Sequence, residues 1–77
     1  MAIKRKTTAQ LQAQCDAWNE LHGIGTLIAY EEIRGEGETH RGKSTTDAQL
    51  LEGHSAVIWL EGKRGCVSLD HCMALAP

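Results

Sequence analysis

The feature that most constrains the fold is an uninterrupted apolar run at residues 56–60, the longest in the chain. Its residue types favour a β-strand. Strand side chains alternate between two faces, so one set, beginning with Ala56, points one way, and Val57 and Trp59 point the other way. Because both faces of this strand are apolar, both need cover, which a sheet with one wet face does not provide. The 77 residues allow one core to supply that cover.

Glycine-containing turns organise the sequence around this strand into two expected hairpins. In the first, over residues 25–43, strand formers extend from Thr26 to Tyr30 and the strand continues to Ile33. Residues 34–38, with two glycines, form the turn, and residues 39–43 return as a polar strand.

The second expected hairpin pairs the apolar run with residues 66–69, across a turn at residues 61–65. In the returning strand Val67 and Leu69 share one face. A tight turn at residues 70–72 then leads into a last short strand at residues 73–75.

Two segments carry the threonine-to-glutamine spacing of a helix capping box, residues 7–10 and residues 46–49. The first predicts a helix from Thr8 to His22, with Leu11, Cys15, Trp18 and Leu21 forming one apolar stripe. Gly23 would end it in the left-handed conformation. The second predicts a short helical turn at residues 47–52 that docks by its leucines.

The expected fold class is therefore α+β, an N-terminal amphipathic helix followed by a small antiparallel SH3-like half-open barrel with one short helical turn. A flat three-stranded sheet packed against the helix is the competing architecture. Residues 1–7 are expected to be a flexible basic tail, and residues 8–77 one small domain, with the helix at 8–22 and the β-rich part at 25–76.

Composition narrows the setting in which such a domain works. The N-terminal residues lack the apolar core of a signal peptide. No apolar run approaches the roughly 18 residues that cross a bilayer, so we expect no membrane partner. Three irregularly spaced cysteines do not make a disulfide framework and favour a reducing cytoplasm. The formal net charge of −2 argues against strong non-specific binding of nucleic acid.

Several segments together resemble small uncharacterised proteins encoded by tailed phages and prophages. The resemblance covers residues 16–73 and rests on the segments 25–30, 44–54, 56–62 and 65–71. It implies an accessory protein in the cytoplasm of a bacterial host cell, of a kind that binds and redirects a host protein, in host takeover or against host defence.

A fainter resemblance, at the level of the SH3-like fold, is to the plasmid-borne type II dihydrofolate reductases. The segment at residues 67–70 aligns with the reductase strand that lines their pore. Ser68 and Asp70 stand where that family has the glutamine and tyrosine that hold cofactor or substrate. Both polar groups are changed, so the resemblance implies the fold without the activity.

No motif in the chain indicates catalysis or a bound cofactor. His71 and Cys72, with Cys66 and His54, lack the paired spacing of zinc ligands, and we expect no metal. A cysteine–histidine nucleophile would need an oxyanion turn that the sequence lacks. We therefore expect a chain that is not an enzyme and has no cofactor.

Two kinds of binding surface follow from these observations. The first binds a host protein or a second copy of the chain, through the strand around Trp59, flanked by His54, Arg41 and Lys43, with Val57 on the same strand face. The second, less favoured, binds nucleic acid through scattered basic side chains, namely Arg34, Arg41, Lys43, Lys63 and Arg64. The partner and the oligomeric state are left open at this point.

Overall fold

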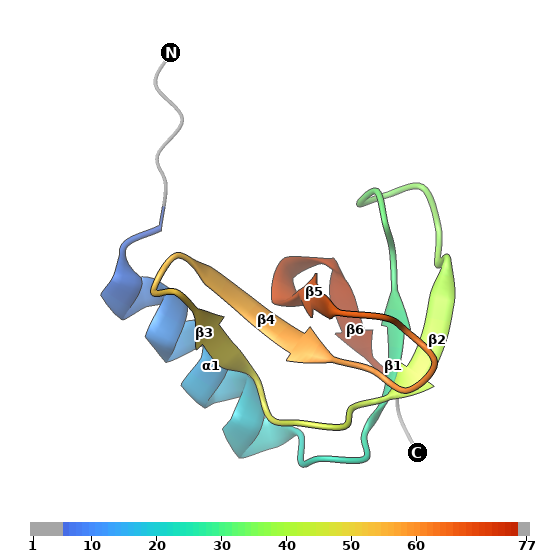
Figure 1. The fold of residues 1–77 in the computed structure, drawn as a ribbon, viewed down its shortest axis with the longest axis horizontal. Helices are drawn as coiled ribbons and strands as arrows, with labels where there is room; N and C mark the ends of the chain where they lie inside the picture. The colour runs from blue at the N-terminus through green and yellow to red at the C-terminus, as the bar shows by residue number, and fades with distance from the viewer. Residues whose placement is uncertain (1–5, 76–77) are drawn as a thin grey trace.

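The computed structural model describes residues 6–75, in which one helix is followed by six short strands (Figure 1). The expectations for residues 1–5 and 76–77 lie outside the described residues. The elements are α1 (Thr8–Leu21), β1 (Leu27–Tyr30), β2 (His40–Lys43), β3 (Gln49–Leu51), β4 (Ser55–Trp59), β5 (Cys66–Ser68), the 3-10 helix η1 (Leu69–His71) and β6 (Cys72–Ala74).

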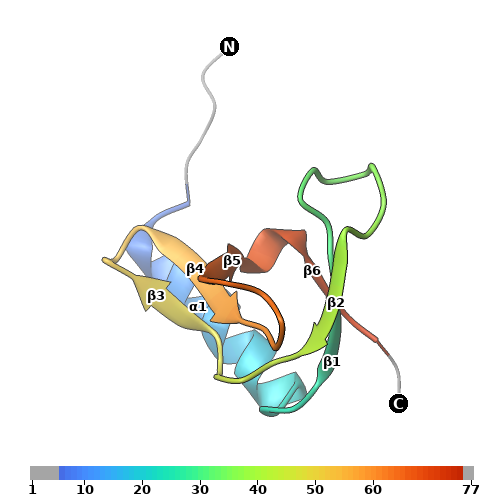
Figure 2. The ribbon, with the colours of Figure 1, turned by 45° about the vertical axis from the view of Figure 1, so that its right-hand side comes forward.

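The strands form two antiparallel three-stranded sheets, with the orders β2-β1-β6 and β3-β4-β5. A bridge between Ser44 and Leu60 joins them where the chain passes from the first sheet to the second. Figure 2 shows α1 lying beside β3 and β4, with β1 and β2 on the other side of the molecule. The sheets do not close into a barrel, so the expected α+β class with a half-open β-part is confirmed, and the single flat sheet is not found.

The core lies between the sheets and α1 and is built from small and aliphatic side chains. Two isoleucines, Ile28 of β1 and Ile58 of β4, are fully buried, so each sheet contributes one anchor. The expected alternation holds, because the core includes the residues of β4 and β5 that we assigned to one face. The buried cluster is Leu11, Cys15, Ile28, Ala48, Ala56, Ile58, Leu60, Val67 and Leu69.

The N-terminal helix begins as expected. Thr7 is its cap, its hydroxyl accepts from the Gln10 amide at 3.1 Å, and the Gln10 side chain accepts from the Thr7 amide at 2.8 Å. Lys6 also lies close to the domain, because its Nζ donates to Gln14 and Asp70. The basic tail therefore does not extend to residue 7.

The end of α1 differs from the expectation. The helix stops at Leu21, and Gly23 is not left-handed; the first glycine with positive φ is Gly25, at 96°. The Gly23 carbonyl is instead held by the hydroxyl of Thr26 at 2.6 Å. Of the predicted apolar stripe, Leu11 and Cys15 are buried and Trp18 packs against the core, but Leu21 is 77% exposed because the helix runs past the edge of the core.

The predicted helical turn at residues 47–52 is wrong, since the chain forms strand β3 there. Its capping groups are engaged otherwise: the Thr46 hydroxyl donates to the Asp47 carbonyl, and the Gln49 side chain donates to the Asp47 carboxylate. Glu52 and Gly53 both have positive φ and turn the chain tightly from β3 into β4. The only short helix in residues 6–75 is η1, so the helical turn sits after β5.

Asn19 fastens α1 to the beginning of β3. Its side-chain amide donates to the Ala48 carbonyl at 2.9 Å, and its side-chain oxygen accepts from the Ala48 amide at 2.7 Å. One side chain thus satisfies both backbone groups of a buried residue, as a neighbouring strand would.

The first hairpin is confirmed, with Leu27 opposite Lys43 and Tyr30 opposite His40, but its first strand is shorter than predicted. The strand does not continue through residues 31–33 because the Glu31 carboxylate accepts from the amides of Gly35 and Gly37, at 3.2 and 3.0 Å. These bonds pull the chain into a loop immediately after β1. Both glycines have positive φ, as the predicted turn requires.

The second hairpin is confirmed, with Ile58 opposite Val67 in β4 and β5. The last strand, β6, lies one residue earlier than predicted and pairs with β1, placing Met73 opposite Ala29.

Candidate functional site

The outer face of the β3-β4-β5 sheet is the candidate functional surface. Residues directly opposite one another in an antiparallel pair share a face. Val57 stands opposite Gln49 of β3 and Ser68 of β5, and Trp59 stands opposite Cys66. We call this surface the Trp59 face; its members are Gln49, Leu51, Ser55, Val57, Trp59, Cys66 and Ser68.

No helix covers the Trp59 face. The helix packs on β3 and β4 through Leu11 and Cys15, which belong to the buried cluster together with Ala56 and Ile58. Those β4 residues alternate with Val57 and Trp59, so α1 lies on the opposite side of the sheet. The Trp59 face is therefore an open surface of residues 6–75.

The Trp59 face carries no charge. None of its seven members is acidic or basic, although 23% of all residues in the chain are charged. Protein interfaces are depleted of charge at their centres and enriched in tryptophan. The composition of this face is therefore that of an interface centre.

The relief of the face follows from the exposure of its apolar side chains. Leu51 is 43% exposed, Trp59 and Cys66 are half-buried, and Val57 is only 5% exposed beneath its neighbours. Val57, which the sequence suggested as a contact, thus forms the floor of the face, and Leu51 and Trp59 form its accessible apolar surface.

The backbone at Trp59 is held in place from the first sheet. The amide of Thr45 donates to the Trp59 carbonyl at 2.9 Å, and the Thr45 hydroxyl donates to the same oxygen at 3.3 Å. With this carbonyl bonded twice, the strand has a fixed position from which the indole projects.

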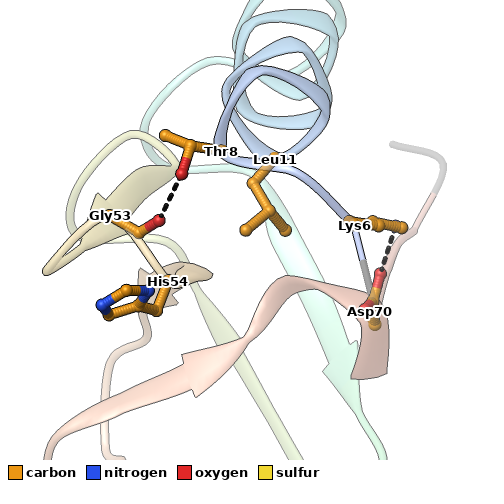
Figure 3. A pocket seen from close by; sticks show the side chains of 6 residues that line it. All are labelled: Lys6, Thr8, Leu11, Gly53, His54 and Asp70. Carbon is orange, nitrogen blue, oxygen red and sulfur yellow. Dashed lines mark hydrogen bonds and ion pairs between the residues drawn. The ribbon is translucent and has the colours of Figure 1, made fainter. Parts of the chain in front are cut away.

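His54 lies at the other end of β4, in the wall of a cavity of about 450 Å³ between the beginning of α1, the β3–β4 turn and η1 (Figure 3). The Thr8 hydroxyl donates to the Gly53 carbonyl at 3.0 Å, and the Lys6–Asp70 ion pair spans 3.3 Å. Figure 3 shows His54 on the opposite side of this cavity from Asp70. His54 is exposed and precedes Ser55, so it borders the Trp59 face without joining its centre.

Arg41 and Lys43, expected beside Trp59, belong to the other sheet. Arg41 donates to both carboxylate oxygens of Glu38, at 2.9 and 2.6 Å, and this bonding lowers the pKa of the Glu38 carboxyl. Lys43 lines a cavity of about 780 Å³ with Leu27 and Leu75. The structure therefore brings Val57 and Trp59 together and leaves the two basic residues apart from them.

The basic residues of the nucleic-acid alternative are also dispersed. Arg34 lines a cavity with three carboxylates, and Arg41 is paired with Glu38. Lys63 lies over the Tyr30 ring, 5.5 Å from its centroid, and Arg64 follows it in the β4–β5 turn. Within residues 6–75 these side chains, with Lys43, do not make one continuous basic tract.

The thiols have no nucleophilic character. Burial raises the pKa of the Cys72 thiol to about 11, and burial together with the nearby carboxylates of Asp16 and Asp47 raises the pKa of the Cys15 thiol. A reactive cysteine needs the opposite shift. Among the residues described, no group of three or more histidines, cysteines and carboxylates could hold a metal ion.

The reductase-like positions are engaged in local structure. Ser68 is exposed at the end of β5, and the Asp70 carboxylate accepts from Gln14 at 2.7 Å and from Lys6 at 3.3 Å. In the described part of the chain, no helix has the length and apolar character needed to cross a membrane.

Comparison with protein-family models, with curated proteins and with solved structures finds no match to this chain. The argument for function therefore rests on the surface itself. Sequence reasoning missed five of its members, Gln49, Leu51, Ser55, Cys66 and Ser68. The signal that could have found the first two is the Glu52–Gly53 pair, which favours a tight turn between strands.

Proposed function

We propose that this chain is a non-catalytic protein-binding module that contacts its partner through the Trp59 face. The observation that carries the proposal is the seven-residue sheet face that has no charge, no helical cover and a tryptophan near its middle. Tryptophan is among the commonest residues whose truncation weakens a protein interface.

The partner that fits this face is another protein with an apolar, uncharged patch. Gln49, Ser55 and Ser68 are exposed around the apolar members and supply neutral hydrogen-bonding groups at the rim. Such a surface suits a folded partner better than a phosphate backbone, which needs cations. The resemblance to phage and prophage accessory proteins adds the proposal that the partner is a bacterial host protein.

Site-specific photo-crosslinking in bacterial cells tests the proposal. A photoreactive residue replaces Ser68 on the Trp59 face in one variant, and Glu20 on the exposed side of α1 in the control. We expect crosslinks from position 68 to a different protein, none to that protein from position 20, and their loss when Trp59→Ala is added. Circular dichroism of each purified variant shows that the fold is kept.

Equal crosslinking from positions 20 and 68, or crosslinks unaffected by Trp59→Ala, would contradict the proposal. Titration with DNA and RNA at two salt concentrations tests the other class of partner. Tight binding with a steep salt dependence would show that the chain is a nucleic-acid-binding module instead.

A further inference from the structure

A second surface, separate from the Trp59 face, gathers most of the exposed apolar side chains. Leu21 is 77% exposed, and Ile24 and Met73 are each 66% exposed. Leu21, Leu27 and Leu75 line one cavity of about 780 Å³ between the end of α1 and the edge of the β2-β1-β6 sheet. We call this surface the Met73 face; its members are Leu21, Ile24, Leu27, Met73 and Leu75.

Backbone pairing explains how these side chains come together. Met73 stands opposite Ala29 in β1, and the Leu75 amide donates to the Leu27 carbonyl at 2.9 Å. Leu27, Ala29, Met73 and Leu75 therefore share the outer face of the sheet, since alternate residues such as Ile28 point into the core. Leu21 and Ile24 extend the apolar surface beyond the end of the sheet.

The two ends of the Met73 face differ in charge. The cavity at the Leu27 end is lined by Lys43 and His22 and by no carboxylate. A second cavity, of about 330 Å³, lies at the other end over Ala29 and Met73. Its charged lining residues are three carboxylates and one arginine: Glu31, Glu38, Asp70 and Arg34. Met73 lies between a basic end and a predominantly acidic end.

We propose that the Met73 face binds a second copy of this chain, in a two-fold dimer with Met73 close to the axis. A two-fold arrangement reverses the direction of one face relative to the other, so the basic end of each copy meets the acidic end of its partner. The same reversal buries Met73 of both copies beside the apolar floor at Ala29. The charge pattern is thus complementary to itself.

A second copy also answers the physical problem that this face poses. A domain of this size has a small core, which oligomerisation commonly supplements. A cluster of exposed apolar side chains on a monomer is an aggregation risk unless a partner covers it. The Trp59 face belongs to the other sheet, so the dimer leaves it free, and this inference stands whether or not the proposed function is correct.

Analytical ultracentrifugation over a dilution series tests the dimer. We expect the parent chain to associate to a dimer in the micromolar range, and Met73→Glu to weaken the association roughly tenfold or more, because like charges then face each other near the axis. The matched control is Leu51→Glu, which puts the same charge on the Trp59 face and leaves the dimer unchanged. Circular dichroism checks that both variants fold.

A second pair of variants tests the direction of the dimer. Lys43→Glu makes both ends acidic and is expected to weaken association several-fold, an effect that salt reduces, whereas Arg64→Glu in the β4–β5 turn leaves association unchanged. Equal effects of these two variants would overturn the reversed arrangement. A parent chain that stays monomeric at millimolar concentration would overturn the dimer, as would a monomer that binds phospholipid vesicles through Met73.

Discussion

On the β3-β4-β5 sheet the outer face is level and uncharged, whereas on the β2-β1-β6 sheet apolar side chains stand out between charged ends. Val57, at the centre of the first surface, is 5% exposed, while Met73, at the centre of the second, is 66% exposed. The inner faces do not differ in this way, because each sheet buries one isoleucine completely. The contrast therefore arises outside the shared core.

The contrast teaches how two surfaces of one small domain can serve different partners. A neutral, level face sets few constraints on the orientation of what binds it, because no charge must be matched. A protruding side chain between a basic and an acidic end fixes both position and direction. The four predictions that follow test whether the two sheets differ as this account requires, beginning with the largest effect.

The largest expected effect tests what the two sheets share. Ile28→Ala and Ile58→Ala should each lower the free energy of unfolding by about 2–5 kcal/mol, because each removes a fully buried aliphatic side chain from the core. Urea unfolding followed by tryptophan fluorescence and by circular dichroism should show one coincident transition in both variants. Two separate transitions would mean that the sheets unfold independently.

The second prediction compares the centres of the two outer faces. Trp59→Ala should lower the free energy of unfolding by about 1–2 kcal/mol, less than for a fully buried aromatic, because the indole is half-buried. Met73→Ala should change it by less than about 0.5 kcal/mol when measured at high dilution, where the chain is monomeric. If the Met73 variant is the more destabilised monomer, our account of the two faces is reversed.

The third prediction concerns the helix, which covers only the β3-β4-β5 sheet. Thr7→Ala removes the cap of α1 and should cost about 1 kcal/mol. Hydrogen exchange should then rise in α1 and β3 before it rises in β1. Thr46→Ala serves as the control and should change stability little, because its hydroxyl bonds only to the adjacent Asp47 carbonyl. Equal losses from both variants would show that the segment at Thr46 contributes a cap after all.

The smallest expected effect depends on pH. The hydrogen bond from Gln14, assisted by Lys6, holds the pKa of the Asp70 carboxyl below its ordinary value of 3.8. A lowered pKa in the folded state adds stability that is fully present above the ordinary pKa and is lost as the pH falls through the folded value. The gain is small because Asp70 is largely exposed.

Urea unfolding from about pH 5 down to about pH 2 measures this acid-dependent contribution. Asp70→Asn should flatten the acid part of the stability profile, and Gln14→Ala should reproduce most of that change. An Asp70→Asn profile that parallels the parent would show that the contact between α1 and η1 adds no stability.

Local signals in the sequence predicted most of the fold. The two capping signatures show both the strength and the limit of such signals. At Thr7 the signature is followed by fourteen helical residues, two of which are buried in the core, so local preference and packing agree. At Thr46 the same spacing is followed by Glu52 and Gly53, whose positive φ turns the chain back to pair with β4. Tertiary pairing overrides the local signal there.

The candidate surface was only partly predictable for the same reason. Alternation along β4 predicted that Val57 and Trp59 share a face away from Ile58, as the structure shows. The neighbours of that face come from β3 and β5, and their register depends on long-range pairing that a single strand does not encode. Arg41 and Lys43 were placed beside Trp59 by proximity in sequence, but β2 pairs with β1 and carries them to the other sheet.

The Asn19 side chain has a consequence for how the domain survives in a crowded cell. A strand at the edge of a sheet offers unpaired backbone groups to any passing chain, and this is a common route to fibrils. Where the chain enters β3, the Asn19 amide already occupies both the donor and the acceptor of Ala48. The helix thus acts as a built-in chaperone for that edge, and a single residue, Asn19, separates a docked helix from an open template for aggregation.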